Sequence, residues 1–386
     1  MSDITSEIKK RRTFAIISHP DAGKTTLTEK FLLYGGAINL AGSVKGKKTA
    51  KHAVSDWMEI EKERGISVTS SVLQFNYDGY CINILDTPGH EDFSEDTYRT
   101  LDSAVMVIDA SKGVEKQTIK LFKVCVMRHI PIFTFINKMD REANDPFELL
   151  DEIENVLGIA TCPINWPIGC GKAFKGVYDR KQKEVSLFKA AMNGQKEVDT
   201  KNISIDDDEL KAEIGDDYWA KLEEDVELLD GASAEFDMDL VSRGELSPVF
   251  FGSALTNFGV EVFLKHFLKM PTSPLPRKSD HGEIDPMTEK DFSAFVFKIQ
   301  ANMNKAHRDR IAFMRICSGE FDAGMEVYHV QGNRKQRLSQ PQQMMASERK
   351  MIDKFLKIVW TSHLSLHQKG KHPKGAQVRR ATLSLF

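Results

Sequence analysis

The stretch "FAIISHPDAGKTT" (residues 14–26) decides the fold, because it joins an apolar run to a turn that ends in Gly-Lys-Thr. A strand, a tight turn and a helix starting at a lysine form a phosphate-binding loop, where backbone N–H groups and the helix dipole face an anion. The strict pattern G-x-x-x-x-G-K-[ST] has glycine where this chain has Ser18, a position that mainly needs a small residue. We predict a nucleotide site formed by Ser18, His19, Pro20, Asp21, Ala22, Gly23, Lys24, Thr25 and Thr26.

Apolar runs alternate with helical patterns over about the first 140 residues. The predicted strands are Thr13–Ser18, Cys81–Asp86, Ala104–Asp109 and Ile132–Asn137, all apolar throughout, as is typical of strands covered on both faces. Helices are expected over Lys24–Leu33 and Lys116–Arg128, the second with Ile119, Phe122 and Val126 on one face. This alternation predicts an α/β fold with a doubly wound, mostly parallel sheet, whose ligands bind beyond the carboxyl ends of the strands.

A second motif, "DTPGH", follows the strand that ends at Asp86. Lys24 would bridge the β- and γ-phosphates, the hydroxyl of Thr25 would ligate Mg²⁺, and Asp86 would reach the ion through water. The N–H of Gly89 can sense a γ-phosphate. Either motif alone could be a chance turn or a helix cap, but both must converge on one ligand. We therefore assign Asp86, Thr87, Pro88, Gly89 and His90 to the same site.

Two further motifs choose the base. The motif "NKMD" (Asn137, Lys138, Met139 and Asp140) follows the fourth strand. A carboxylate accepts two hydrogen bonds from the guanine edge, a donor pair that adenine lacks. Asn137 can bond the ring edge, the stem of Lys138 can cover the base, and the N–H of Ala254 in "GSAL" (with Ser253 and Leu255) can reach guanine O6. The site is predicted to hold GTP or GDP.

The rest of the chain departs from this rhythm. We expect an insertion at about 160–245, where Lys196–Glu245 holds eighteen acidic residues against five basic ones. Three prolines in Pro271–Arg277 predict a linker. The expected domains are a GTP-binding domain (1–272), a linker (273–290), an incomplete β-barrel (291–353) and a basic tail (354–386). The tail has seven Lys or Arg and no acid, and we interpret it as disordered or as the product of a shifted reading frame.

Composition narrows the class of protein. The 386 residues are 41% hydrophobic and 28% charged, as is ordinary for a globular protein. No apolar run is long enough for a membrane span. The five cysteines form no C-x-x-C pair, which favours reduced thiols and a cytoplasmic location. The net charge of −3 indicates that any contact with nucleic acid uses local basic patches.

These motifs resemble the translational GTPase family, the group that includes elongation factor G. "DWMEIEKERGIS" (Asp56–Ser67) is similar to the first switch of that family, and "DTPGHEDF" carries its histidine. Within the family, "RRTFAIISHPDAGKTT", "SEDTYRTL", "WPIGCGKAFKGVYD" and "FVFKIQANM" resemble the branch of bacterial GTP-dependent release factors. The resemblance runs from about Arg11 to Asp353.

The resemblance implies a ribosome-dependent GTPase of translation termination, which recycles class-one release factors and acts as a monomer. His90 would position the attacking water, and Lys24 and Gly89 would be the other catalytic residues. Asp21 would support the geometry of the phosphate loop. Ser67 stands where the family has a Mg²⁺-ligating threonine and keeps the hydroxyl. Two alternatives stay open: a translocation GTPase like elongation factor G, and a truncated protein that binds guanine nucleotide without ribosome-stimulated hydrolysis.

Overall fold

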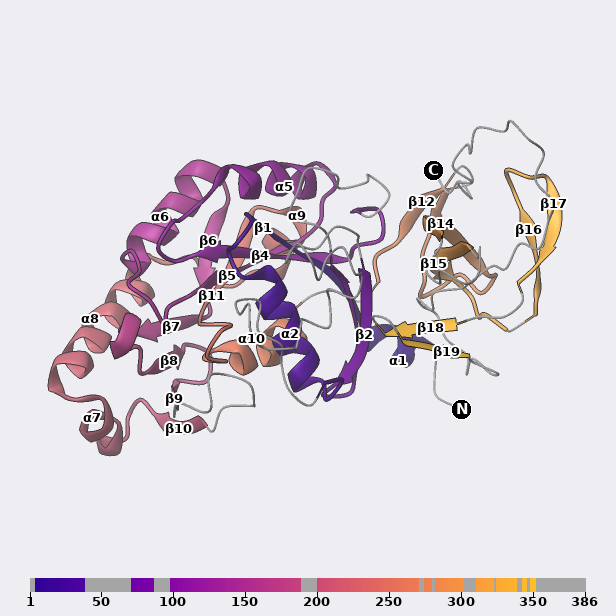
Figure 1. Cartoon of the computed structure of the whole chain (residues 1–386). Helices are drawn as coiled ribbons and strands as arrows, with labels where there is room; N and C mark the ends of the chain where they lie inside the picture. The colour runs from indigo at the N-terminus through magenta and orange to yellow at the C-terminus, as the bar shows by residue number, and fades with distance from the viewer. Residues whose placement is uncertain are drawn as a thin grey trace.

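The structure, a computed structural model, describes part of the chain. The described residues are 4–38, 71–86, 98–188, 200–270, 274–279, 282–301, 310–322, 324–338, 342–345 and 348–351. Figure 1 shows a layered body of helices and strands, a smaller sheet with helices at one end of it, and a group of strands at the other end. The candidate site belongs to the layered body.

The body is built on a sheet of seven strands in the order β2-β3-β1-β4-β5-β11-β6. All neighbouring strands are parallel except β2 and β3, which are antiparallel. The strands are β1 (Arg11–Ser18), β2 (Ser71–Tyr77), β3 (Tyr80–Asp86), β4 (Ser103–Asp109), β5 (Ile132–Asn137), β6 (Ala160–Pro163) and β11 (Leu246–Phe251). The four predicted strands are confirmed as β1, β3, β4 and β5.

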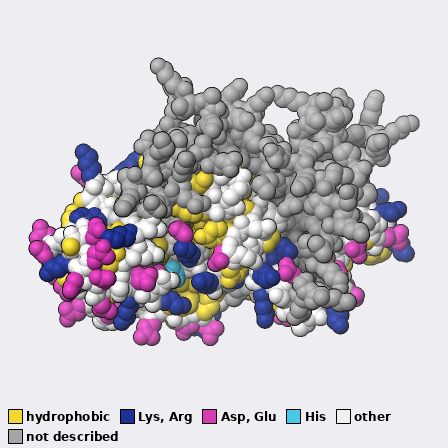
Figure 2. Space-filling view, turned by 90° about the horizontal axis from the view of Figure 1, so that it is seen from below, with side chains coloured by type: hydrophobic (Ala, Val, Ile, Leu, Met, Phe, Trp, Pro, Cys, Tyr) yellow, Lys and Arg dark blue, Asp and Glu magenta, His cyan; other side chains and the backbone are white. Residues whose placement is uncertain are grey.

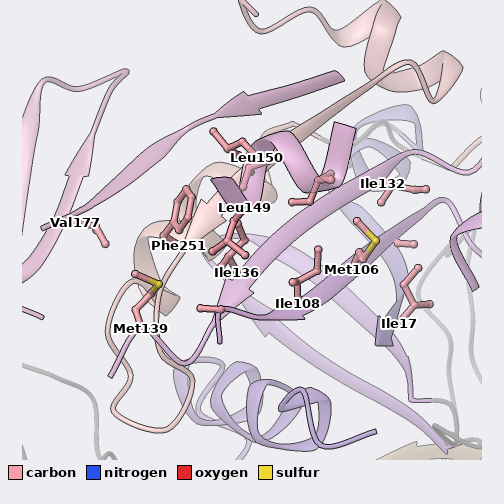
Figure 3. Packing of buried hydrophobic residues seen from close by; sticks show 14 of the residues in the cluster. Ile17, Met106, Ile108, Ile132, Ile136, Met139, Leu149, Leu150, Val177 and Phe251 are labelled. Atoms are coloured by element: carbon pink, nitrogen blue, oxygen red, sulfur yellow. The ribbon is translucent and has the colours of Figure 1, made fainter. Parts of the chain in front are cut away.

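Helices cover both faces of this sheet, which confirms the doubly wound arrangement. One face packs on α5 (Lys116–Met127) and α6 (Pro146–Leu157), and the other packs on α2 (Lys24–Tyr34) and α10 (Val260–Phe267). Alternate side chains of a strand point to opposite faces. The first core therefore contains Ile17, Met106, Ile108, Ile132, Ile136, Leu149 and Leu150 (Figure 3), and the second contains Phe14, Ile16, Val107, Phe133, Phe31 and Phe263.

The predicted inner face of α5 was partly wrong. Phe122 is buried as expected, but Val126 is 37% exposed and Ile119 is only half-buried. The buried stripe is Thr118, Leu121, Phe122 and Cys125. It follows i, i+3, i+4, i+7 spacing, and a small polar Thr and a Cys occupy two of its positions. The sequence pattern missed it because these two residues carry weak hydrophobic signals.

Beyond α6, which is capped by Asp145, the chain builds a second sheet. Its antiparallel order is β10-β9-β8-β7, from β7 (Asn165–Ile168), β8 (Gly176–Asp179), β9 (Glu184–Phe188) and β10 (Thr200–Ser204). A short 3-10 turn, η1 (Gly171–Ala173), precedes β8, and the helices α7 (Asp208–Ile214), α8 (Asp216–Ala232) and α9 (Met238–Arg243) follow β10. Because β6 pairs with β11, residues 160–163 belong to the main sheet.

The acidic residues of the insertion lie mostly on the outer faces of α7 and α8. Figure 2 shows acidic side chains gathering at this end of the molecule. The inner face of α8 is held by a buried hydrogen bond of 2.9 Å from the Trp166 Nε1 to the Asp225 carboxylate. The acidic part of the insertion therefore forms exposed helices, with α8 anchored through one buried aspartate.

The C-terminal part is antiparallel, with four hairpins in the described stretches. They pair β12 (Arg277–Ser279) with β13 (Gly282–Ile284), β14 (Ser293–Ala301) with β15 (Arg310–Ser318), β16 (Glu326–His329) with β17 (Arg334–Arg337), and β18 (Gln342–Met345) with β19 (Glu348–Met351). Met314, Ile316, Phe321 and Leu338 form its small core. The strands expected after residue 291 are confirmed. The N-terminal helix α1 (Ile4–Lys9) and strand β2 lie on this side of the body, where β18 contacts β2 (Figure 1).

Candidate guanine-nucleotide site

Four strands of the parallel sheet deliver their carboxyl ends to one edge. The register places Ser18 of β1 beside Val107 of β4, and Asp109 of β4 beside Asn137 of β5. Phe251 of β11 lies beside Ile136, so the loop that follows it starts at the same edge. The phosphate loop, the "NKMD" motif and the loop after Phe251 therefore start at one edge, because every strand of this group is parallel.

The loop after β1 turns tightly into α2. The N–H of Ala22 donates to the carbonyl of His19 over 3.2 Å, and the N–H of His19 donates to the hydroxyl of Thr118 over 3.1 Å. Asp21 has φ 66° and Gly23 has φ 107°, both in the left-handed region, with Gly23 as the N-cap of α2. A side chain at position 23 would meet the Nδ2 of Asn137 at 2.2 Å. Gly23 is thus required by both its backbone angle and its neighbour.

Asn137 bridges two loops of the site. Its Nδ2 donates to the carbonyl of Ala22 over 2.8 Å, and its Oδ1 accepts from the N–H of Ala254 over 2.8 Å. The side chain is 1% exposed. The amide nitrogen has a second N–H for the edge of a base, which fits our prediction for Asn137. The N–H of Ala254, which we expected at guanine O6, is used by Asn137 in this structure.

Lys138 ties the phosphate loop to β4. Its ammonium donates over 2.6 Å to the carbonyl of Asp21 and over 2.6 Å to the carboxylate of Asp109. Burial would raise the pKa of Asp109, but hydrogen bonds from Lys138 and Ser111 outweigh it and hold this pKa below its usual value. The end of the Lys138 stem is therefore fixed by two acceptors of its ammonium.

Asp140 is presented by two neighbouring loops. Its Oδ1 accepts a hydrogen bond of 2.6 Å from the hydroxyl of Ser253, and the N–H of Met139 donates to the carbonyl of Gly252 over 3.1 Å. On the other side, the N–H of Gly171 donates to the carbonyl of Met139 over 2.8 Å. These bonds fix the direction of the carboxylate, which suits it to read a pair of donors on a base.

The structure places the other predicted residues as follows. Ser18 and Ala22 are buried, His19, Pro20, Thr25 and Thr26 are half-buried, Lys24 is 8% exposed at the first turn of α2, and Leu255 is 49% exposed. Ser67, Thr87, Pro88, Gly89 and His90 lie outside the described residues, as does the side chain of Asp86, although its backbone ends β3.

Two residues of the site were not predicted. Asp109 carries the anchor of Lys138, and Gly171 supports Met139 from the inserted region. Asp109 had a usable signal, since it ends a buried strand just as Asp86 and Asn137 do. Gly171 had none, because its role depends on how the insertion folds back.

The described part of the chain contains neither a cluster of metal-binding side chains nor a membrane-spanning helix. Its His, Cys, Asp and Glu residues form no group of three suited to hold a metal ion. None of its helices combines the length and apolarity needed to cross a bilayer. Of the side chains predicted to bind Mg²⁺, that of Thr25 lies within the described part of the chain and those of Ser67 and Asp86 lie outside it.

Comparisons with family models divide the chain in two. Residues 9–273 match the model described as the elongation factor Tu GTP binding domain. Residues 291–356 match that of elongation factor G domain 2. The first match contains every strand and helix described above for the nucleotide site.

Curated relatives share most of the chain. The peptide chain release factor 3 of Symbiobacterium thermophilum is 63% identical over 356 residues, 92% of this chain and 67% of the relative. The proteins of that name from Cyanothece sp. and Synechocystis sp. are 53% and 54% identical over 91% and 92% of this chain, and 65% of each relative is covered. The chain thus spans about two thirds of the length of the curated relatives it matches. A crystal structure of a protein from Thermus thermophilus shares the fold, with a TM-score of 0.70, 21% sequence identity, and coverage of 95% of this chain and 55% of that one.

Proposed function

We propose that this chain, which belongs to the peptide chain release factor 3 family, hydrolyses GTP when it is bound to the ribosome and so promotes the departure of class-one release factors during termination. The observation that supports the nucleotide part is that Asn137 bonds the phosphate loop at Ala22, while Asp140, three residues further along, is oriented by Ser253. The family membership supports the termination role, since its members are named for it.

The described residues fit a guanine nucleotide. Gly23 leaves the loop without a Cβ beside Asn137, and Lys24 starts a helix whose positive end faces the loop. The carboxylate of Asp140, oriented by Ser253, can accept from two guanine donors. Adenine offers no such pair at that edge, so ATP is expected to bind weakly.

Mg²⁺ belongs to this proposal as the ion that neutralises phosphate charge when bound. We assign it to Thr25, Ser67 and Asp86, whose hydroxyl and carboxylate oxygens are ligands of the kind that Mg²⁺ prefers. Thr25 follows Lys24 in the first turn of α2, the helix that carries the phosphate loop. Substitution of Thr25 by valine keeps the shape and removes the oxygen, so it tests this assignment through the Mg²⁺ dependence of nucleotide binding.

The chain's own residues would act on hydrolysis in three ways. Lys24 and the N-terminus of α2 would hold negative oxygens of the phosphates. The N–H of Gly89 would sense the terminal phosphate, and His90 would hold a water in line for attack. In this class of enzyme the intrinsic rate is about 10⁻⁴ to 10⁻² per second and activators add roughly 10³ to 10⁵. The isolated chain should therefore turn over GTP slowly.

The test is ribosome-stimulated GTP hydrolysis by the chain and by His90→Ala. We expect strong stimulation of the unchanged chain, little in the variant, and equal GDP affinity for both. Absence of stimulation in the unchanged chain, with GDP still bound, would favour the alternative of a protein that only binds nucleotide. Full stimulation of the variant would remove His90 from the mechanism.

A second pair of assays separates the termination role from translocation. The chain should accelerate the dissociation of a class-one release factor from ribosomes after peptide release and should leave translocation of transfer RNA unchanged. The opposite pattern would favour the alternative of a factor like elongation factor G. Displacement of GDP by ATP as effectively as by GTP would contradict the assignment of Asp140.

The expected partners are thus ribosomal RNA and proteins and the class-one release factors. We place the protein in the cytoplasm, where it would meet ribosomes, and as a monomer. The outer acidic faces of α7 and α8 would repel phosphate groups, so contact with RNA is expected elsewhere on the chain.

A further inference from the structure

Three charged side chains, two of them buried and Arg277 half-buried, join the nucleotide-binding body to the C-terminal strands. Asp102 immediately precedes β4, Arg277 begins β12, and Arg315 lies within β15. Asp102 is 2% exposed and Arg315 is 1% exposed. Charged side chains are rarely buried this deeply unless they are paired. Here the carboxylate belongs to the nucleotide-binding body and both arginines belong to the C-terminal strands.

The two arginines hold three consecutive residues of the body. Arg315 donates to both carboxylate oxygens of Asp102, over 2.9 and 3.0 Å, and to the carbonyl of Thr100 over 2.6 Å. Arg277 donates to the carboxylate of Asp102 over 2.7 Å and to the carbonyl of Leu101 over 2.9 Å. The bonds from Arg315 to the carboxylate both come from Nη2, while Nη1 donates to Thr100, so the rigid guanidinium fork grips the carboxylate and a main-chain carbonyl together.

Arg315 keeps its charge at neutral pH. Burial lowers the pKa of Arg315 to about 10, while the charge of Asp102 acts in the opposite direction. That value leaves the guanidinium protonated at neutral pH. Loss of either arginine leaves a buried carboxylate with fewer donors, and loss of Asp102 leaves a buried and a half-buried cation side by side, so the group acts as a unit.

Thr100–Asp102 are connected to the proposed nucleotide site by the chain segment before them and by the strand after them. Along the chain, Thr100–Asp102 come shortly after the "DTPGH" motif with its proposed catalytic histidine. In the fold, Asp102 is the residue before β4, and that strand ends at Asp109, whose carboxylate binds the ammonium of Lys138. A displacement of Thr100–Asp102 would therefore reach the site through the main chain.

We propose that Arg315 and Arg277 position Thr100–Asp102 from the C-terminal strands, and that the seating of these strands is thereby coupled to which nucleotide the body holds. The coupling is reciprocal: if the nucleotide changes how firmly the arginines are seated, then loss of the arginines changes the preference between nucleotides by the same factor. It rests on the proposed guanine-nucleotide binding but does not need the ribosome.

Amide hydrogen exchange tests the positioning directly, in the whole chain without ribosomes. The N–H of Leu101 donates to the carbonyl of Tyr98 and the N–H of Asp102 donates to the carbonyl of Thr13. Arg315→Met should accelerate exchange at both amides at least tenfold, and Arg315→Lys by less, since it keeps the cation and loses the fork. The matched control is Arg243→Met, which breaks an exposed ion pair with Glu245 and should change neither amide.

Nucleotide affinities test the coupling. The ratio of the dissociation constants for GDP and for a non-hydrolysable GTP analogue should shift at least fivefold in Arg315→Met and in the same direction in Arg277→Met, within the range typical of coupled sites. Wild-type exchange at Leu101 and Asp102 in Arg315→Met would overturn the proposal, and so would an unchanged ratio. If Arg315→Met does not fold, Arg315→Lys and Arg277→Met carry the same two measurements. Failure of the unchanged chain to bind guanine nucleotide would instead contradict the site itself.

Discussion

The bridge made by Asn137 can be tested against a second buried asparagine that also donates one hydrogen bond to a carbonyl and accepts one from an N–H. Asn165 in β7 donates from Nδ2 to the carbonyl of Phe251 over 3.1 Å and accepts from the N–H of Phe251 over 2.7 Å. Asn137 makes the equivalent two bonds to Ala22 and Ala254, each over 2.8 Å. Both side chains are buried. The variants Asn137→Ala and Asn165→Ala therefore remove the same number of buried hydrogen bonds.

The magnitude follows from the partners left behind. Each variant leaves one carbonyl and one N–H buried without the amide that served them, and an unsatisfied buried group costs about 1–3 kcal/mol. We expect a loss of about 3 kcal/mol in the free energy of unfolding for either variant. For a domain of this size that lowers the melting temperature by roughly 6–12 °C.

The two variants should differ in their affinity for GDP and so in how much GDP stabilises them. Only the bonds of Asn137 join the phosphate loop to the loop of Ala254. We expect the dissociation constant for GDP to rise at least tenfold in Asn137→Ala, which is about 1.4 kcal/mol, and to change little in Asn165→Ala. Urea unfolding with and without GDP measures both effects, because a ligand at 100 times its dissociation constant stabilises by about 2.7 kcal/mol.

Two results would refute this reasoning. Stability of Asn137→Ala within about 0.5 kcal/mol of the unchanged chain, the range of ordinary surface substitutions, would mean that its hydrogen bonds are not formed in solution. Equal loss of GDP affinity in both variants would mean that the effect is general loosening of the body, and that Asn137 has no special part in joining the two loops.

Three further substitutions test single features of the site. Gly23→Ala should cost about 1–3 kcal/mol in unfolding free energy and weaken GDP binding, whereas Gly36→Ala, at φ 64° with nothing within 4 Å, should leave GDP binding unchanged. Asp140→Asn should favour xanthine over guanine nucleotides in competition binding, because the amide replaces an acceptor by a donor. For Asp109 the folded pKa is lowered, so its contribution to stability is present above its unfolded pKa of about 3.9 and is lost as pH falls through the folded value. Asp109→Asn should therefore destabilise the chain at pH 7, and the difference from the unchanged chain should shrink in unfolding measured near pH 3.

Local patterns predicted which strand ends meet at the candidate site, because these strands are apolar throughout. The end of each such strand is visible in the sequence, and a parallel sheet brings those ends to one edge. The strands that lead up to Ser18, Asn137 and the loop after Phe251 were predicted on this basis, and the register places them in one parallel group, with β4 between β1 and β5.

Pairwise contacts were less predictable, since they depend on distances that no local pattern encodes. The N–H of Ala254 was expected at the base, but Asn137 takes it. The buried stripe of α5 was misread because Thr118 and Cys125 stand out little in a hydrophobicity pattern. The donors to Asp102 come from residues 175 and 213 positions away, a separation over which sequence periodicity carries no information.

Strand β4 links these observations. Its amino end adjoins Asp102, held by the two arginines, and its carboxyl end is Asp109, which holds the lysine of the base motif. The strand between them is fully buried and hydrogen-bonded to β1 and β5, so it has little freedom to bend. Because β4 is rigid and has an ion pair at each end, a displacement of Asp102 would move Asp109 as well. Both ion pairs use a carboxylate adjoining the same strand, so substitutions at the two ends should be non-additive in GDP affinity, whereas Asp109→Asn combined with the remote Arg243→Met should be additive.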